Sequence, residues 1–206
     1  MADVRPYHSP RRELSAAATR RDIINAARRL FARSGYAQVT VADVAREAGT
    51  AVKTVYASAG GKAEILREIV HDAVTSSGAL ETVAQVRGTT DAAAALTLLA
   101  HGTRLGNEHH REAIAILYSA MSVDESAEDL WTQGTSVYRT ALREVAEHLE
   151  SLGALKADLT VDQCADLLWF CFGLASWRTL VNDCHWTWEQ AEAELAAIAI
   201  RLLIST

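Results

Sequence analysis

The stretch TVADVAREAGTAVKTVYASAGGK (Thr40–Lys62) predicts the element on which the whole fold depends, two short helices joined by a tight turn. Thr40 and Asp43, three residues apart, form a capping box at the start of the first helix. Gly49 is expected to end that helix, because glycine adopts the left-handed conformation without a steric cost. A further helix is expected to begin after the glycine pair that precedes the final lysine.

The second of these short helices is expected to present a polar surface. Three apolar residues recur at helical spacing and are expected to face inward: Val52, Val55 and Ala59. Lys53, Thr54 and Tyr56 then point outward and offer a cation, a hydroxyl and a phenol. A short polar helix supported by a second helix is typical of a helix-turn-helix DNA reader.

Four segments extend this pattern along the chain, IINAARRLFARSGY, TVADVAREAG, KTVY and GKAEIL, in this order. Together they resemble the DNA-binding domain of the TetR/AcrR family of bacterial transcriptional regulators, over roughly Arg20 to Leu66. The resemblance implies a homodimeric regulator, most often a repressor, that binds double-stranded operator DNA. It also implies that a small-molecule effector releases the DNA. No cofactor or metal is expected.

The resemblance further implies DNA contacts at particular positions. Thr40 and Lys62 correspond to residues that hold phosphates, and Thr54 and Tyr56 to residues that contact phosphate or base. Lys53 is the candidate for base recognition, because its ammonium can donate to guanine O6 or N7. Thr40 could instead act as a helix cap alone, and Tyr56 could be a partly buried packing ring.

The sequence departs from the family pattern at two pairs of residues. Thr50 and Ala51 stand where the family has an aliphatic residue and a serine cap, so Thr50 is expected to cap the second helix and is also a candidate DNA contact. Ser58 replaces a histidine and could donate weakly to a phosphate. Ala59 replaces a phenylalanine, and the loss of such a core ring alone costs about 3–5 kcal/mol. A helical small-molecule-binding protein with a weakened or lost DNA-binding head is therefore the alternative.

Charge divides the chain into two parts. Through Lys62 there are 11 Lys+Arg and 5 Asp+Glu, a net charge of +6, whereas the remainder has 9 and 21, a net charge of −12. A basic head on an acidic body is typical of a phosphate-binding module joined to a part that stays off DNA. We therefore expect an all-α chain with two domains. Residues 1–65 form the tail and helix-turn-helix domain, and residues 66–206 form a helical ligand-binding and dimerisation domain.

Both prolines lie within the first ten residues, so long helices are unobstructed after them. Caps and boundary signals along the chain predict about nine helices. Residues 1–14 are expected to form a tail, and Thr19 with Asp22 to cap the first helix. Three tail arginines could lie along DNA or remain solvated: Arg5, Arg11 and Arg12. The helix from Lys62 is expected to reach about Thr82 and to link the two domains mechanically.

Caps predict the remaining helix boundaries in the C-terminal part. Asn107 is expected to cap a helix that runs through Met121. Ser126 and Asp129 are expected to cap a long helix that Gly153 closes. Capping boxes then open the last two helices: Thr160 with Gln163, and Thr187 with Gln190.

Aromatic side chains in the C-terminal part predict a small-molecule site between helices. Aromatic residues at helical spacing also form ordinary cores, and the sequence leaves this alternative open. The candidate ligand contacts are His101, Tyr118, Met121, Trp131, Tyr138, Trp169, Phe172 and Trp177.

The last two helices carry apolar stripes that predict a dimer surface. Two such hairpins would form a four-helix bundle across a two-fold axis, although packing within one chain is the alternative. The candidate interface residues are Leu167, Leu174, Val181, Ala191, Leu195, Ile198 and Leu202.

Other classes of protein fit the sequence less well. Cys164 and Cys171 lie two turns apart and could form a thiol or metal site, but no metal-binding or nucleophile motif accompanies them. No apolar run approaches the roughly 18 residues of a membrane span, and no signal peptide is visible. We therefore expect a cytoplasmic protein that is not an enzyme and makes no membrane contact.

Overall fold

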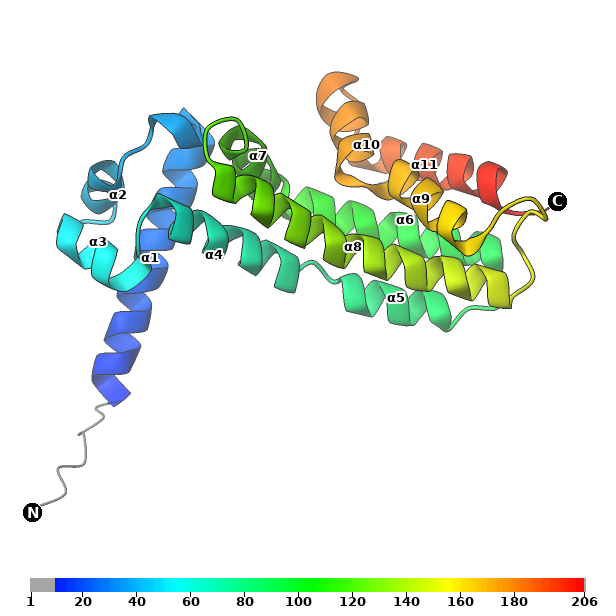
Figure 1. The fold of residues 1–206 in the computed structure, drawn as a ribbon, viewed down its shortest axis with the longest axis horizontal. Coiled ribbons are helices and arrows are strands. Elements are labelled where there is room, and N and C mark those ends of the chain that lie inside the picture. The colour runs from blue at the N-terminus through cyan, green and yellow to red at the C-terminus, as the bar shows by residue number, and fades with distance from the viewer. Residues whose placement is uncertain (1–9, 206) are drawn as a thin grey trace, which may run out of the picture. The chain divides into compact units, whose positions relative to one another are not determined.

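The computed structural model describes residues 10–205, with side chains from Glu13 onward. This part of the chain is helical, and its one β-contact is an isolated antiparallel bridge between Leu155 and Ile204 (Figure 1). The all-α prediction is confirmed. The α-helices are α1 (Pro10–Ser34), α2 (Val41–Glu47), α3 (Val52–Ala59), α4 (Lys62–Thr75), α5 (Ala79–Arg87), α6 (Ala92–His109), α7 (Arg111–Ala120), α8 (Glu125–Ser151), α9 (Val161–Phe172), α10 (Leu174–Arg178) and α11 (Trp188–Leu203), with a 3-10 turn η1 (Tyr36–Gln38) and a π-helical turn η2 (Thr179–Asp183).

The predicted helices are present within residues 10–205, but two of them are interrupted. The helix expected from Lys62 to Thr82 is divided into α4 and α5 by Gly78, whose φ is 73°. The helix capped by Thr160 is divided into α9 and α10 at Gly173, which is extended with ψ 162°. A Cβ at Gly173 would lie 2.4 Å from the main-chain carbonyl oxygen of Trp169, so this close approach requires glycine.

The first helix starts earlier than the sequence predicts. Pro10 is its first residue, a position where the missing N–H of proline costs no hydrogen bond. Thr19 therefore lies inside α1, and its hydroxyl donates to the Ser15 carbonyl at 3.0 Å. The predicted capping box of Thr19 and Asp22 is wrong, and so is a tail that extends to residue 14. Residues 1–9 of that tail lie outside the described residues, as do the following side chains: Arg11 and Arg12.

Two further caps differ from the prediction. Asn107 lies within α6, where its side-chain amide donates to the Thr103 carbonyl at 2.8 Å, so it does not cap α7. The start of α8 is held by Asp124, whose Oδ1 accepts from the Ser126 N–H at 3.0 Å. Ser126 is therefore a residue of the first turn of α8 and not its cap. The predicted capping boxes of α9 and α11 are confirmed.

The chain forms two compact units. The first contains residues 10–72 and Glu112–Leu130, and the second contains residues 73–111 and 131–205. Both α4 and α8 therefore include residues of each unit. In the first unit α1 packs against α2 and α3. Its buried apolar residues include Ile23, Ala27, Phe31, Val44, Val55 and Ile65.

In the second unit, α6 packs against α5 and α11, and α11 packs against α9 (Figure 1). The second half of α8 contributes to the same apolar core. The largest fully buried side chains of this core are Leu96, Leu142, Leu149, Leu168, Phe172 and Trp177.

One segment of the described residues, Val161–Asp183, is by length and composition apolar enough to cross a membrane, with a mean hydropathy of 1.2. Such a segment was not expected from the sequence. It comprises α9, α10 and η2 and is interrupted at Gly173. Core helices of globular proteins have the same composition, so a single segment of this kind is weak evidence for a membrane span.

Candidate DNA interface and ligand site

The predicted capping box at the start of α2 is confirmed. The Asp43 N–H donates to the Thr40 hydroxyl oxygen at 3.2 Å, and the Thr40 N–H donates to Asp43 Oδ2 at 3.0 Å. The bond from the Thr40 side chain lowers the pKa of Asp43. Thr40 is nevertheless exposed, so its hydroxyl oxygen lies at the surface where α2 begins.

The turn between α2 and α3 has the predicted glycine but a different cap. Gly49 has a φ of 64°, the left-handed conformation that ends α2. Ala51 occupies the N-cap position of α3, and its carbonyl accepts from the Thr54 N–H at 2.8 Å. Thr50 lies one residue too early and uses its N–H to bond the Ala45 carbonyl at 2.9 Å. The prediction that Thr50 caps α3 is therefore wrong.

The outer face of α3 carries the predicted polar residues. Lys53 is exposed, Thr54 is half-buried, and the side chain of Tyr56 is 57% exposed. Val55 and Ala59 are buried as predicted, but Val52 is 42% exposed. Val52 is the first residue of α3 and is not buried in the core, so the prediction that it faces inward is wrong. The exposed Tyr56 ring favours a surface role over packing.

The two residues that depart from the family pattern at the end of α3 have structural roles. The Ser58 carbonyl accepts a hydrogen bond from the Arg20 guanidinium, and Arg20 Nε also donates to Glu68 at 3.1 Å. Ala59 is 2% exposed and belongs to the core. These contacts join α1 to both α3 and α4. Ser58 is half-buried, and the phosphate contact expected of its side chain stays a prediction.

Lys62 begins α4, after Gly60 with a φ of 79° and a bond from the Gly61 N–H to Glu64 Oε2 at 2.9 Å. Its ammonium donates to the Tyr36 carbonyl at 2.7 Å and lies 4.2 Å from the centroid of the Tyr36 ring. Burial lowers the pKa of Lys62, and the nearby Asp124 partly offsets this.

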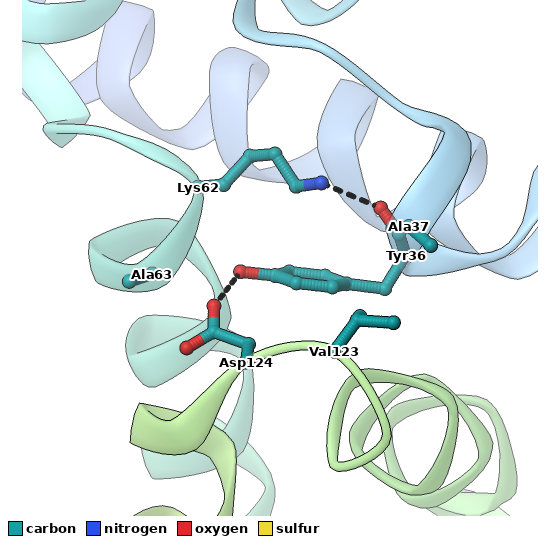
Figure 2. A pocket seen from close by; sticks show the side chains of 6 residues that line it. All are labelled: Tyr36, Ala37, Lys62, Ala63, Val123 and Asp124. Atoms are coloured by element: carbon teal, nitrogen blue, oxygen red, sulfur yellow. Dashed lines mark hydrogen bonds between the residues drawn. The ribbon is translucent and has the colours of Figure 1, made fainter.

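Tyr36 is the centre of this cluster, which was not predicted from the sequence. The ring is 2% exposed, and its hydroxyl donates to Asp124 Oδ2 at 2.5 Å. Figure 2 shows Lys62 and Asp124 on Tyr36 from different sides, in a pocket of the first unit. The lining residues are Tyr36, Ala37, Lys62, Ala63, Val123 and Asp124. No sequence motif connects Tyr36 with a residue 88 positions away.

Four predicted ligand residues come together in the second unit. The rings of Tyr138 and Trp169 meet edge to face, with centroids 5.5 Å apart. The Tyr138 hydroxyl donates to the Phe172 carbonyl at 2.6 Å, and Trp177 Nε1 donates to the same oxygen at 3.1 Å. This carbonyl can accept both bonds because the chain leaves helical geometry at Gly173.

Polar groups of α6 accompany this aromatic cluster. Thr103 and Asn107 are 7% and 6% exposed, and the Thr103 hydroxyl donates to the Leu99 carbonyl at 2.8 Å. Burial raises the pKa of Tyr138, and the nearby Asn107 and Thr103 side chains partly offset the effect. These two polar residues were not among the ligand contacts predicted from the sequence. Buried polar groups among aromatic rings are typical of small-molecule sites.

The other predicted ligand residues belong to α6, to α7 and the turn after it, and to α8. His101 is exposed on α6, and its Nδ1 lies 3.1 Å from Glu192 Oε1 of α11. Trp131 is half-buried at the start of the second unit's part of α8. Tyr118 and Met121 belong to the first unit, and their role as ligand contacts stays a prediction.

The predicted dimer residues differ in how far they are exposed in the single chain. Ala191 and Leu195 are 0% and 5% exposed within the single chain, so they already serve its core. Leu202 is 37% exposed, and Phe170, which was not predicted, is 67% exposed. The remaining candidates are half-buried: Leu167, Leu174, Val181 and Ile198.

Two of the three cysteines, Cys164 and Cys171, have buried thiols. Burial raises the pKa of Cys164 to about 12 and that of Cys171 to about 11, so both thiols are protonated at neutral pH. Cys184 is exposed. Within residues 10–205, no group of three or more His, Cys, Asp or Glu residues is placed to hold a metal ion.

The N-terminal part matches a known family. Residues 23–69 match the model of the family described as "Bacterial regulatory proteins, tetR family". This span includes all of α2 and α3 and parts of α1 and α4. The resemblance of these segments to the family is therefore confirmed. No curated protein matches the chain by sequence.

Solved structures share the fold over nearly the whole chain. FadR, the fatty acid degradation regulator from Bacillus halodurans, has a TM-score of 0.73 and 16% identity, with 94% of this chain and 96% of that chain covered. A regulator-like protein from Saccharomonospora viridis in complex with choline has a TM-score of 0.72 and 20% identity, with 92% and 100% covered. The SmeT–triclosan complex has a TM-score of 0.70 and 17% identity, with 91% and 92% covered. The fold is thus that of TetR-family transcriptional regulators.

Proposed function

We propose that this protein is a cytoplasmic transcriptional regulator that binds an operator in double-stranded DNA as a homodimer and acts as a repressor. The exposed polar face of α3 carries the proposal, since it stands beside a capped α2 in the helix-turn-helix arrangement. Lys53 contacts a base, while Thr54 and Tyr56 contact base or phosphate. Thr40, Thr50 and Ser58 face the phosphate backbone from neighbouring positions.

A dimer is needed because two heads must meet half-sites about 34–36 Å apart, or a multiple of that distance. The proposed interface lies on α9, α10, η2 and α11, where apolar side chains remain exposed or half-buried. It comprises Leu167, Phe170, Leu174, Val181, Ile198 and Leu202.

A small molecule is proposed to release the DNA by binding at the cluster of Tyr138, Trp169 and Phe172. Solved proteins of the same fold carry choline or triclosan, which supports a small organic effector. Aromatic faces attract both cations and other rings. The release needs only a ligand that binds one arrangement of the dimer better than the other. No catalytic step, cofactor or metal is part of this proposal.

A gel shift with the DNA flanking the protein's own gene tests the proposal. Wild-type protein should retard the fragment at low salt, and Lys53→Ala should weaken binding by about 1–3 kcal/mol. Triclosan and choline are the first effector probes. Absence of retardation by folded wild-type protein would refute the DNA-binding function. Effector binding without DNA binding would favour the alternative, a helical ligand-binding protein. The departure from the family pattern at Ser58 and Ala59 motivates this alternative.

A further inference from the structure

The cluster around Tyr36 gathers three segments that are far apart in the sequence. Tyr36 lies in η1, between α1 and α2, and its ring contacts Phe31 with centroids 5.0 Å apart. Lys62 is the first residue of α4, and Asp124 directly precedes α8. The phenol and the main-chain carbonyl of Tyr36 are therefore held by residues of two different segments, as Figure 2 shows.

The contact between Tyr36 and Asp124 is a charge-assisted hydrogen bond at neutral pH. Burial and the neighbouring carboxylate raise the pKa of Tyr36, so the phenol keeps its proton and donates it. Bonds from Ser126 and from Tyr36 lower the pKa of Asp124, so its carboxylate is ionised and accepts. Hydrogen bonds of this kind are roughly twice as strong as neutral ones.

Asp124 also fixes the first turn of α8 with its other oxygen. Oδ1 accepts from the Ser126 N–H at 3.0 Å and from the Ser126 hydroxyl at 2.6 Å, which leaves Oδ2 for Tyr36. One carboxylate therefore ties the turn between α7 and α8 to η1. From Tyr36 the chain needs only four residues to reach Thr40, the cap of α2.

The ammonium of Lys62 is already engaged within the protein. One of its three protons is donated to the Tyr36 carbonyl, and the ring of the same residue lies beneath it. The resemblance to the family assigns a phosphate contact to this position, whereas the observed contacts join Lys62 to Tyr36 within the protein.

We propose that Lys62 and Asp124 are positioning residues for DNA binding, which hold Tyr36 from both sides and thereby fix the segment that leads into α2. The proposal rests on the proposed DNA-binding function. In it, Lys62 supports the reading helices without neutralising a phosphate, and the turn between α7 and α8 is part of their support.

The dependence of DNA binding on salt distinguishes positioning from phosphate contact. Each phosphate contact contributes about −0.9 to the slope of log K against log salt. With the operator fragment retained in the gel shift, Lys62→Met should weaken binding about 10-fold, the equivalent of ~1.4 kcal/mol, and leave the slope unchanged. Tyr36→Phe, which alters no charge, should weaken binding similarly. Thermal unfolding of each variant gives the fraction of protein that is folded at the assay temperature. Each affinity is then calculated from the concentration of folded protein.

The sign of the effect of Asp124→Asn provides a second readout. Removal of a negative charge from a DNA-binding unit should by electrostatics alone strengthen binding. Positioning predicts the opposite, a loss of about 10-fold. Asp22→Asn is the matched control, because Asp22 is an exposed carboxylate on α1 of the same unit. This control should bind as wild type or slightly more tightly.

Three outcomes would overturn the proposal. The first is a salt slope for Lys62→Met that is shallower than wild type by about 0.9 per bound subunit, which would identify a phosphate contact. The second is tighter DNA binding by Asp124→Asn, or an unchanged affinity for DNA in both Lys62→Met and Asp124→Asn. In these cases wild-type binding persists, and the proposed function stands. The third is absence of DNA binding by wild-type protein, which would refute both proposals.

Discussion

Each unit of the molecule contains a tyrosine hydroxyl in a hydrogen bond that joins distant segments, but the partners differ in charge. Tyr36 of the first unit donates to the carboxylate of Asp124 at 2.5 Å. Tyr138 of the second unit donates to the main-chain carbonyl of Phe172 at 2.6 Å. A bond to a charged group contributes about 1.5–3 kcal/mol to stability, compared with about 0.5–1.5 kcal/mol for a neutral one.

This difference agrees with the two proposed tasks. The contact of Tyr36 holds the entry to the reading helices, and a rigid support serves recognition of a fixed DNA surface. The contact of Tyr138 uses neutral groups beside Trp169, at a carbonyl that the break at Gly173 has freed from helical bonding. A ligand with a hydrogen-bonding group can replace a neutral contact at a lower cost than a charged one. The second unit is thus the better place for an exchangeable contact.

The largest predicted effect concerns packing around Tyr138. Phe172 is fully buried, so Phe172→Ala should lower the free energy of unfolding by about 3–5 kcal/mol through reduced burial and a cavity. Urea unfolding followed by circular dichroism measures the change. Leu80→Ala is the control, because Leu80 is 88% exposed and should change stability by no more than about 0.5 kcal/mol. Equal effects of the two substitutions would show that the aromatic cluster is not a packed core.

The sequence predicted local features of both units well. The capping boxes at Thr40, Thr160 and Thr187 were correct, because each depends on residues three positions apart. The helix ends at Gly49 and Gly153 were correct because glycine adopts the left-handed conformation there. Helix starts that depend on competition between neighbouring caps were predicted less well. The N-cap position of α3, expected at Thr50, is occupied by Ala51, which has no capping side chain.

Contacts between distant segments were not predictable from one sequence. The sequence around Tyr36 or Asp124 does not predict their hydrogen bond, because the bond depends on the path of α7 and α8. The same holds for the Phe172 carbonyl, which accepts two bonds only because Gly173 interrupts the helix. Periodicity placed Trp169 and Phe172 on one helix but could not separate a ligand site from a core.

The second prediction compares the two hydroxyl groups directly. Tyr36→Phe should lower the free energy of unfolding by about 1.5–3 kcal/mol, because it removes the donor to Oδ2 of an ionised carboxylate and leaves only the Ser126 bonds to Oδ1. Tyr138→Phe should lower it by about 0.5–1.5 kcal/mol, since Trp177 still donates to the Phe172 carbonyl. Urea titrations of wild type and both variants in the same buffer give the two losses in the free energy of unfolding, which are then compared. A reversed order would remove the distinction between the two contacts.

Acid should affect the contact of Tyr36 and leave that of Tyr138 intact. The pKa of Asp124 is lowered in the folded protein, so its contribution to stability is present above the unfolded value of about 3.9. This contribution is lost as the pH falls from there through the folded pKa. When the pH is lowered from 6 into the acid range, the stability of Asp124→Asn should therefore decrease less than that of wild type. Thermal unfolding at a series of pH values measures this decrease. Tyr138→Phe should lose as much as wild type, because its partner does not titrate. An acid profile of Asp124→Asn that matches wild type would contradict this assignment.

The smallest predicted effects test whether the units differ only in their long-range contacts. Thr40 and Thr160 form capping boxes of the same geometry, with hydroxyl oxygens that accept at 3.2 Å in both units. Thr40→Ala and Thr160→Ala should therefore each lower the free energy of unfolding by about 1 kcal/mol. Thr50→Ala should change it by no more than about 0.5 kcal/mol, because the Thr50 side chain does not cap α3. Equal losses at Thr40 and Thr160, beside unequal losses at the two tyrosines, would locate the difference between the units in the charge of Asp124. A much larger loss at one cap would instead indicate a general difference in stability between the units, and the tyrosine comparison would then need correction for it.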